Sequence, residues 1–320
     1  LAWNLTKSAG LNGLYHVSMI QNSIEKTLSD DDVTVSDWLL AKQQPQRLIK
    51  QLWEPLCLAT LNTPINEASA HLLAKVLQDS LGNGKADADA LIPTIPLGDI
   101  FPNAAAKFIE ANNGTISLQT RAKQLIIKNK QLSGLRLQNG AELLADTIIV
   151  ATGPSQSYEL VSDAIAITKP SEYPICTIYI QYPPDSRLSK VMIGLTGTVS
   201  QWVFDRSEQT PGLMSVVISG PGEHQALTNN ELIEKVQQEL HSQVKALANA
   251  EAIDSFVIRE KRATFASVKN IEASRPSSMT SIAGLWLTGD FIANGYPATL
   301  EGAIRNGESC AKQIIDQSSQ

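Results

Sequence analysis

The sequence predicts an α/β fold, with about two domains for its 320 residues. Apolar residues recur at helical spacing over residues 14–91. Alternating, extended patterns then dominate residues 115–150 and 173–220. Two strands of continuous apolar residues, "DTIIVAT" and "GLWLTGD", are of the type that a sheet buries on both faces.

Composition excludes several classes of protein. With 43% hydrophobic and 18% charged residues, the chain carries enough apolar material for a sizeable core. A formal net charge of -6 argues against nucleic acid as a partner, and no apolar stretch approaches the roughly 20 residues that span a bilayer. Cys57, Cys176 and Cys310 lack any C-x-x-C spacing, which fits a reducing, cytoplasmic compartment. The scattered histidines predict no metal site.

Helices follow from the apolar spacing in the first part of the chain. The longest stretch contains "VSDWLLAKQQPQRLIKQLWEPLCLATL", for which Ser36 or Asp37 is the predicted N-cap. A shorter amphipathic helix, "LGDIFPNAAAKFIEANNG", ends at Asn113-Gly114.

Strands follow from the alternation in the middle of the chain. A β-meander precedes "DTIIVAT", with turns at Ser133-Gly134 and Asn139-Gly140. Four further strands are "PICTIYIQYP", "KVMIGLTG", "QWVFDR" and "GLMSVVISG". An amphipathic helix over residues 229–249, the extended "SFVIREKRATFAS" and a closing helix, "PATLEGAIRNGESCAKQIIDQ", complete the order.

The stretch "GDFIANGYPATLEGAIRNG" has the residues of a cofactor site between a strand and a helix. Gly289 lets the backbone approach a ligand closely. Asp290 follows a buried strand, where open α/β sheets bind ligands, and its carboxylate can accept hydrogen bonds from ribityl or ribose hydroxyls. Pro297 suits the first turn of a helix.

The start of that last helix favours negative charge. The N–H groups around Thr299, Leu300 and Glu301 point out of the helix, and the helix dipole adds to their effect. Gly302 and Ala303 are small enough for a ring system, such as a flavin that gains negative charge on reduction, to lie close. A core strand, a turn and a surface helix with no ligand is an equally open interpretation.

The same stretch resembles the C-terminal FAD signature of the flavin amine oxidase and phytoene desaturase superfamily. Further stretches resemble one subgroup, the squalene-associated FAD-dependent desaturases, or hydroxysqualene dehydroxylases. These stretches are "VSDWLLAKQQPQRLIKQLWEPLCLATLNTPINEASA", "PTIPLGDIFP", "QWVFDR" and "REKRATFAS". The resemblance covers about residues 34–313.

The resemblance implies a set of FAD contacts. Asp290 is expected near the ribityl–pyrophosphate region, and the segment from Ala298 to Ala303 near the isoalloxazine. Ala122 falls where the family has a Val whose backbone meets the adenine, and Gly153 falls at a cofactor-side turn.

The implied fold is a glutathione-reductase-like FAD-binding domain interleaved with a substrate domain of mixed sheet and helices. Its predicted segments are 1–91 (helical substrate or cap region), 92–158 (FAD domain), 159–259 (substrate-domain sheet and helix) and 260–320 (FAD domain).

The FAD-binding domain is expected to be incomplete. Such flavoproteins open with a strand, G-x-G-x-x-G and a helix that together hold the pyrophosphate, and the sequence contains no G-x-G-x-x-G. We therefore interpret the chain as a segment of a longer protein. Missing strands would leave "DTIIVAT" or "GLWLTGD" partly uncovered.

Three residues are catalytic candidates. Glu54 and Asn62 lie in a segment that could line an apolar tunnel for an isoprenoid chain, and either could supply a polar group near the reacting carbon. The alternative is a structural segment, in which Trp53 and Cys57 are core neighbours four residues apart. Arg262 either faces the flavin, where a cation stabilises its reduced form, or lies on a solvated strand face.

The resemblance implies reductive dehydroxylation of hydroxysqualene to squalene, with FAD as the cofactor and an isoprenoid lipid as the substrate. Collecting such a lipid implies contact with the surface of the inner membrane. Alternatives are a phytoene or carotenoid desaturase, a flavin amine oxidase, and a non-catalytic fragment that cannot hold FAD.

Overall fold

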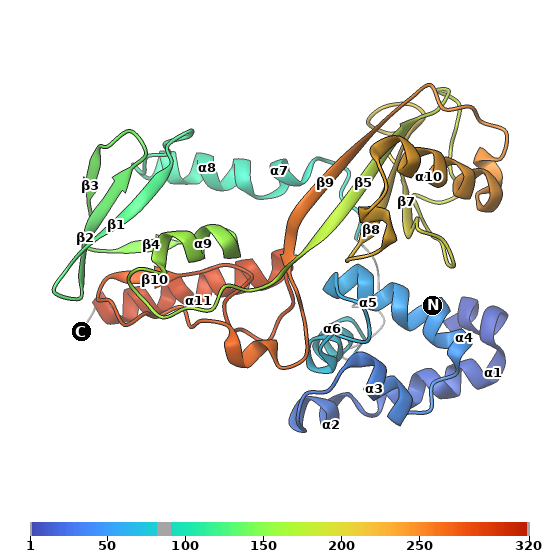
Figure 1. The fold of residues 1–320 in the computed structure, drawn as a ribbon, viewed down its shortest axis with the longest axis horizontal. Helices are drawn as coiled ribbons and strands as arrows, with labels where there is room; N and C mark the ends of the chain where they lie inside the picture. Colours follow the sequence, from blue (N-terminus) through green and yellow to red (C-terminus); the bar gives the residue numbers. More distant parts are fainter. Residues whose placement is uncertain (1, 82–90, 319–320) are drawn as a thin grey trace.

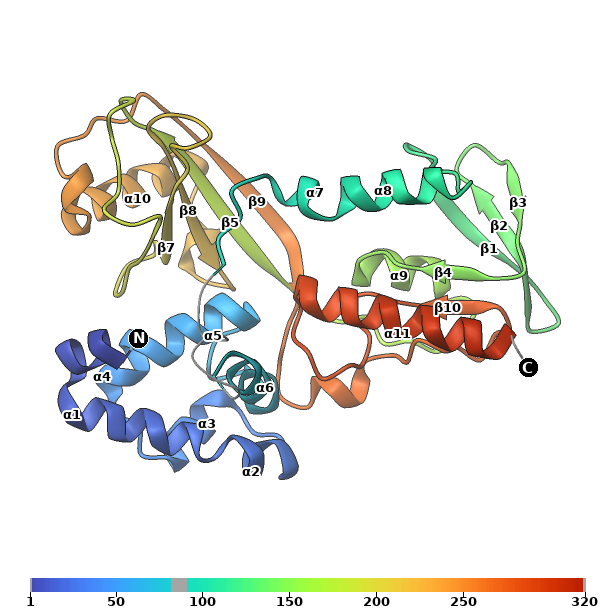
Figure 2. The ribbon, with the colours of Figure 1, turned by 180° about the vertical axis from the view of Figure 1, so that it is seen from behind.

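The structure is a computed structural model that describes residues 2–81 and 91–318. The molecule has three parts. In Figure 1, a helical part and an antiparallel sheet occupy one end of the molecule, and an α/β part occupies the other end. The long strands β5 (Glu172–Gln181) and β9 (Asp254–Phe265) connect the two ends, as Figure 2 shows from behind. Each of these three parts has its own hydrophobic core, which confirms the predicted mixed α/β fold.

The first part is helical, as predicted. Its helices are α1 (Ala2–Gln21), α2 (Ile24–Ser29), α3 (Val35–Ala41), α4 (Gln46–Leu48), α5 (Glu54–Leu61) and α6 (Ala70–Leu81), with a π-helical segment, Ile49–Trp53, between α4 and α5. The predicted N-cap of α3 is wrong by two or three residues. Thr34 caps the helix because its backbone is still extended, and its Oγ1 accepts the N–H of Asp37 at 3.1 Å.

The second part is a five-stranded antiparallel sheet in the order β6-β7-β8-β5-β9. Its other strands are β6 (Met192–Gly194), β7 (Trp202–Asp205) and β8 (Leu213–Ser219). Helix α10 (Asn229–Gln243) buries Leu232, Val236 and Leu240 in the same core as the sheet. All the strands predicted for this region are confirmed.

The third part combines a β-meander, a parallel strand pair and four helices. Its elements are α7 (Leu97–Ile100), α8 (Pro102–Ala111), β1 (Ala122–Lys128), β2 (Gln131–Leu137), β3 (Glu142–Leu144), β4 (Ile148–Val150), α9 (Pro154–Val161), β10 (Leu285–Leu287) and α11 (Leu300–Ser318). Strands β4 and β10 pair in parallel although they come from distant parts of the chain.

One predicted turn of the meander is in the wrong place. Ser133-Gly134 lies inside β2, and the β1–β2 turn is made by Asn129 and Lys130, both with positive φ. Glycine is required at 134 for another reason: a Cβ there would come 2.2 Å from the Leu143 carbonyl oxygen of β3. The second predicted turn, with Gly140 at φ +89, is confirmed.

The two strands expected to be buried on both faces differ. Leu285, Trp286 and Leu287 of β10 are at most 4% exposed. Ile149 of β4 is 45% exposed, so the prediction of burial on both faces is wrong for this strand, and the expectation that one of the two strands is partly uncovered is confirmed. Helix α8 is amphipathic but buries none of its residues, which leaves apolar surface in this part of the molecule.

None of the described helices is both long and apolar enough to cross a membrane. Cys57, Cys176 and Cys310 are free, buried thiols. The predicted segment boundary between residues 259 and 260 falls within β9, and the division into domains stays a prediction.

Candidate functional site

The site starts at the carboxyl edge of the parallel pair β4–β10. The N–H of Thr288 donates to the carbonyl of Val150 at 3.0 Å, so the two strands end side by side. Gly153 follows β4 and is the residue before α9, while Gly289 and Asp290 follow β10. Because parallel strands end at a common edge, both glycines and the Asp290 carboxylate belong to one edge of this sheet, where α/β folds bind ligands.

The backbone explains why glycine stands at position 289. Its φ of +134 is strained for any residue with a side chain. Its N–H donates to Oδ1 of Asn306 at 3.1 Å, and the same oxygen accepts the Thr288 hydroxyl at 2.7 Å. Asn306 is buried on α11, and it therefore ties the last helix to the end of β10.

The amino end of α11 is partly capped from within. Thr299 Oγ1 accepts the N–H of Gly302 at 3.0 Å. The N–H groups of Leu300 and Glu301 have no acceptor inside the helix, because the first turn of any helix leaves its donors unpaired. A Cβ on Gly302 would come 3.0 Å from the carbonyl oxygen of Pro297, so glycine permits the close contact between helix and loop.

Asp290 is a perturbed acid. Burial raises the pKa of its carboxyl group, and the guanidinium of Arg275 offsets this effect only in part. The carboxyl therefore keeps its proton to a higher pH than an exposed aspartate does.

A cavity of about 580 Å³ lies beside the amino end of α11. Its lining residues are Lys75, Val76, Asp79, Ser80, Tyr296, Pro297, Thr299, Glu301 and Arg305. Helix α6 of the helical part and the predicted cofactor segment thus form opposite walls of one pocket. Figures 1 and 2 both place α6 next to the start of α11.

Tyr296 bridges the two walls. Its hydroxyl donates to Oδ2 of Asp79 at 2.7 Å, while Lys75 Nζ and Arg305 Cζ lie 5.3 and 5.2 Å from the centre of its ring. Burial and the bond to Asp79 raise the pKa of Tyr296. Burial opposes ionisation of Asp79, but hydrogen bonds from Lys75 and Tyr296 outweigh it and lower the pKa of that carboxyl.

The three predicted catalytic residues do not share a site. Glu54 lines a different cavity of about 390 Å³, together with Leu58 and His224. Arg262 is exposed on β9. Asn62 is buried and has φ +50 at the end of α5.

The amide of Asn62 is fully used within the protein. Its Nδ2 donates to Thr264 Oγ1 at 2.9 Å and to the carbonyls of Tyr173 and Pro174 at 3.3 and 3.2 Å. Its Oδ1 accepts the N–H of Gly220 at 2.5 Å. These contacts join the helical part to strands β5, β8 and β9, which is a structural task.

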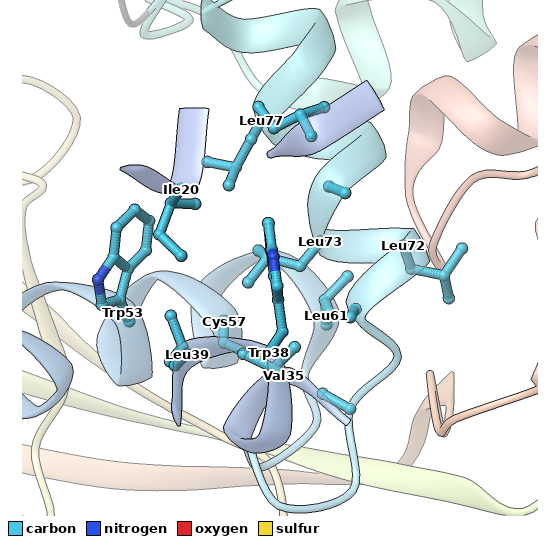
Figure 3. Close-up of a cluster of buried hydrophobic side chains, with 14 of the residues drawn as sticks. Ile20, Val35, Trp38, Leu39, Trp53, Cys57, Leu61, Leu72, Leu73 and Leu77 are labelled. Carbon is cyan, nitrogen blue, oxygen red and sulfur yellow. The ribbon is translucent and has the colours of Figure 1, made fainter. Parts of the chain in front are cut away.

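The neighbours of these residues are core residues. Trp53 and Cys57 are 2% and 0% exposed in the cluster of Figure 3, which favours the structural interpretation of this segment. Burial and the nearby Glu54 raise the pKa of the Cys57 thiol to about 12, so it does not ionise at neutral pH.

The remaining predicted cofactor residues fall in two places. Ala122 begins β1, in the meander at one end of the molecule, whereas Pro297 to Ala303 lie near its middle (Figure 1). Arg275, Asn306 and Tyr296 belong to the site but were missed. Tyr296 and Asn306 lie inside the motif "GDFIANGYPATLEGAIRNG", whereas the sequence carries no signal for Arg275.

Solved structures share this fold. The chain is similar to an oxidoreductase from Methanosarcina mazei, with a TM-score of 0.67 and 16% identity, over 93% of this chain and 72% of that one. It is also similar to cyclohexylamine oxidase from Brevibacterium oxydans, with a TM-score of 0.60 and 14% identity, over 92% of this chain and 69% of that one.

Two proteins that act on isoprenoids are similar to the chain in sequence. Hydroxysqualene dehydroxylase of Zymomonas mobilis is 27% identical over 281 residues, which are 85% of this chain and 64% of that protein. A 15-cis-phytoene desaturase of Solanum lycopersicum is 20% identical, over 90% of this chain and 53% of that protein. The chain thus spans about two thirds or less of the length of these relatives. Residues 19–315 match flavin-containing amine oxidoreductases, and the chain belongs to this family of FAD-dependent oxidoreductases.

Proposed function

We propose that the protein takes part in FAD-dependent reduction of a long isoprenoid alcohol, with hydroxysqualene as the substrate and squalene as the product. The observation that carries this proposal is the pocket between α6 and the amino end of α11, whose walls include part of the segment that follows Asp290 in the chain. The similarity to hydroxysqualene dehydroxylases over 85% of the chain supports the choice of substrate.

The donor and acceptor groups at this edge fit part of FAD. Gly153 and Gly289 add no side chain of their own to the carboxyl edge of β4–β10. The Asp290 carboxyl suits ribityl hydroxyls, and the unpaired N–H groups of Leu300 and Glu301 suit the electron-rich pyrimidine edge. The proposed domain is an incomplete FAD-binding domain, since the sequence offers no G-x-G-x-x-G loop for the pyrophosphate.

When bound, FAD in its reduced form supplies the hydride. Replacing a C–OH bond by C–H needs this hydride and one proton, and the hydroxyl leaves as water. Tyr296 holds an exchangeable proton on Oη inside the pocket, with Asp79 in contact to exchange it with solvent. Tyr296 is therefore our candidate for the acid, in place of Glu54, which lines the other cavity.

Two alternatives transfer a hydride in the opposite direction, from the substrate to oxidised FAD. In a phytoene or carotenoid desaturase the hydride comes from the isoprenoid, and the desaturase relatives support this choice with lower identity. In a flavin amine oxidase the hydride comes from an amine. A third alternative is a non-catalytic fragment that folds without holding FAD. Contact with a membrane surface is proposed only as the route by which a lipid substrate arrives.

Product analysis tests the proposal. The purified chain, with FAD and dithionite, is incubated with hydroxysqualene, and a second sample with oxidised FAD is incubated with phytoene. Squalene in the first sample, absent with Asp290→Ala, is the expected result. A desaturated product in the second sample alone would replace the proposal with the desaturase. No product in either sample would overturn the proposal and leave the flavin amine oxidase and the non-catalytic fragment as the alternatives.

A further inference from the structure

Arg275 is a cation in an unusual position. Its side chain is only 3% exposed, although charged side chains are almost never buried without compensation. It follows a short 3-10 turn, Ile271–Ser274, and its guanidinium lies 4.8 Å from the centre of the Phe265 ring. The groups around it must therefore use its hydrogen-bond donors.

Almost all of these groups belong to one loop. The guanidinium donates to the carbonyls of Phe291, Asp290 and Tyr296 at 3.3, 2.7 and 2.8 Å and also to that of Ile292. It donates to Oδ1 of Asn294 at 3.0 Å. This loop, residues 290–296, begins with Asp290 after β10 and ends just before Pro297 and α11.

Glu272 completes the arrangement and balances the charge. Its Oε2 accepts from Arg275 Nη1 at 2.6 Å, and its Oε1 accepts the N–H of Gly295 at 2.9 Å. Asn294 Oδ1, which Arg275 holds, in turn accepts the N–H of Tyr296 at 2.9 Å. The N–H groups of Gly295 and Tyr296 therefore donate to side chains, Glu272 and Asn294, that Arg275 holds in place.

We infer that Arg275 is a positioning residue that sets the conformation of loop 290–296, and through it the relative placement of Asp290, Tyr296 and the amino end of α11. That these three groups serve a flavin site rests on the proposed function. The fixed loop conformation does not depend on it.

Lysine cannot perform this task. Several acceptors surround a planar group with five N–H donors, whereas an ammonium offers three donors from one atom. Arg275→Lys keeps the charge and is expected to lose most of the loop contacts.

Hydrogen–deuterium exchange of the chain without added FAD tests the inference. In Arg275→Ala and Arg275→Lys, exchange at the amides of Gly295 and Tyr296 is expected to accelerate by about tenfold or more, because local opening becomes easier. Amides in β5 and α10 are expected to keep their protection. A low concentration of guanidinium is expected to slow exchange in Arg275→Ala.

A second arginine provides a matched control. Arg259 donates to Asn229 Oδ1 and to the carbonyls of His224 and Leu227, none of which belongs to loop 290–296. Arg259→Ala is expected to leave Gly295 and Tyr296 protected.

Unchanged exchange at both reporter amides would overturn the inference. Equal acceleration throughout the chain would also overturn it, because Arg275 would then act on global stability alone. Failure of the wild-type chain to bind FAD would count against the proposed function and leave this result intact.

Discussion

Replacing Asn62 separates a structural role from a catalytic one. Asn62→Gly keeps the left-handed backbone at φ +50 but removes the amide that joins Thr264 and Gly220. The three shortest hydrogen bonds of the Asn62 side chain, to Thr264, Pro174 and Gly220, contribute roughly 1 kcal/mol each. Their loss predicts a decrease of about 3 kcal/mol in the free energy of unfolding. Asn62→Ala is expected to lose about 1 kcal/mol more, since alanine is strained in this conformation.

Urea unfolding followed by tryptophan fluorescence measures both variants, because the chain has five tryptophans, two of them in the core around α5. Asn62→Gly within about 0.5 kcal/mol of wild type would refute the structural role. A loss of product formation without loss of stability would instead return Asn62 to the catalytic candidates.

Three further predictions concern single groups. Cys57, with a pKa near 12, is expected to react with a thiol reagent at pH 8 only after unfolding; rapid reaction in the folded chain would contradict its burial. Tyr296→Phe loses the bond to Asp79 and is expected to lower stability by about 1 kcal/mol or less, as that carboxylate is partly exposed; if Tyr296 is the acid, squalene formation falls while FAD binding is unchanged. Burial raises the pKa of Asp290 in the folded chain above the ordinary 3.8, so its contribution to the free energy of unfolding is fully present below pH 3.8 and is lost as the pH rises through the folded-state pKa. Asp290→Asn is expected to remove this pH dependence from the free energy of unfolding measured between pH 3 and 7. The same pH dependence in the variant and in the wild type would contradict the shift.

Local periodicity was sufficient to predict most of the fold. Helical structure between residue 14 and the end of α6, the antiparallel strands of the central sheet and α11 are predicted, because each buries one face at a fixed spacing. The predictions fail where contacts between distant parts of the chain determine the local conformation or the burial of a residue. The pair Ser133-Gly134 predicts a turn because the contact of Gly134 with Leu143 is not visible in the local sequence. The apolar run of β4 alone predicts burial on both faces, whereas the exposure of Ile149 depends on which segments cover the strand.

The site was predictable only where its residues are contiguous. Asp290 and the start of α11 belong to one motif, so their neighbourhood follows from the chain itself. Arg275 has no periodic or motif signal, and its role follows only from the carbonyls that the loop presents to it. The bonds of Asn62 reach residues up to 202 positions away, and no local pattern encodes them.

Titration of the purified chain with FAD, followed by the visible flavin absorption bands, tests most directly whether the edge near Asp290 binds the cofactor. We expect the bands to shift on binding, and Asp290→Ala to weaken the affinity by about tenfold, as loss of one hydrogen bond to a charged group predicts. Arg259→Ala is the control and should bind like wild type. Absence of bound flavin, or equal affinity with and without the Asp290 carboxyl, would contradict a cofactor site at this edge.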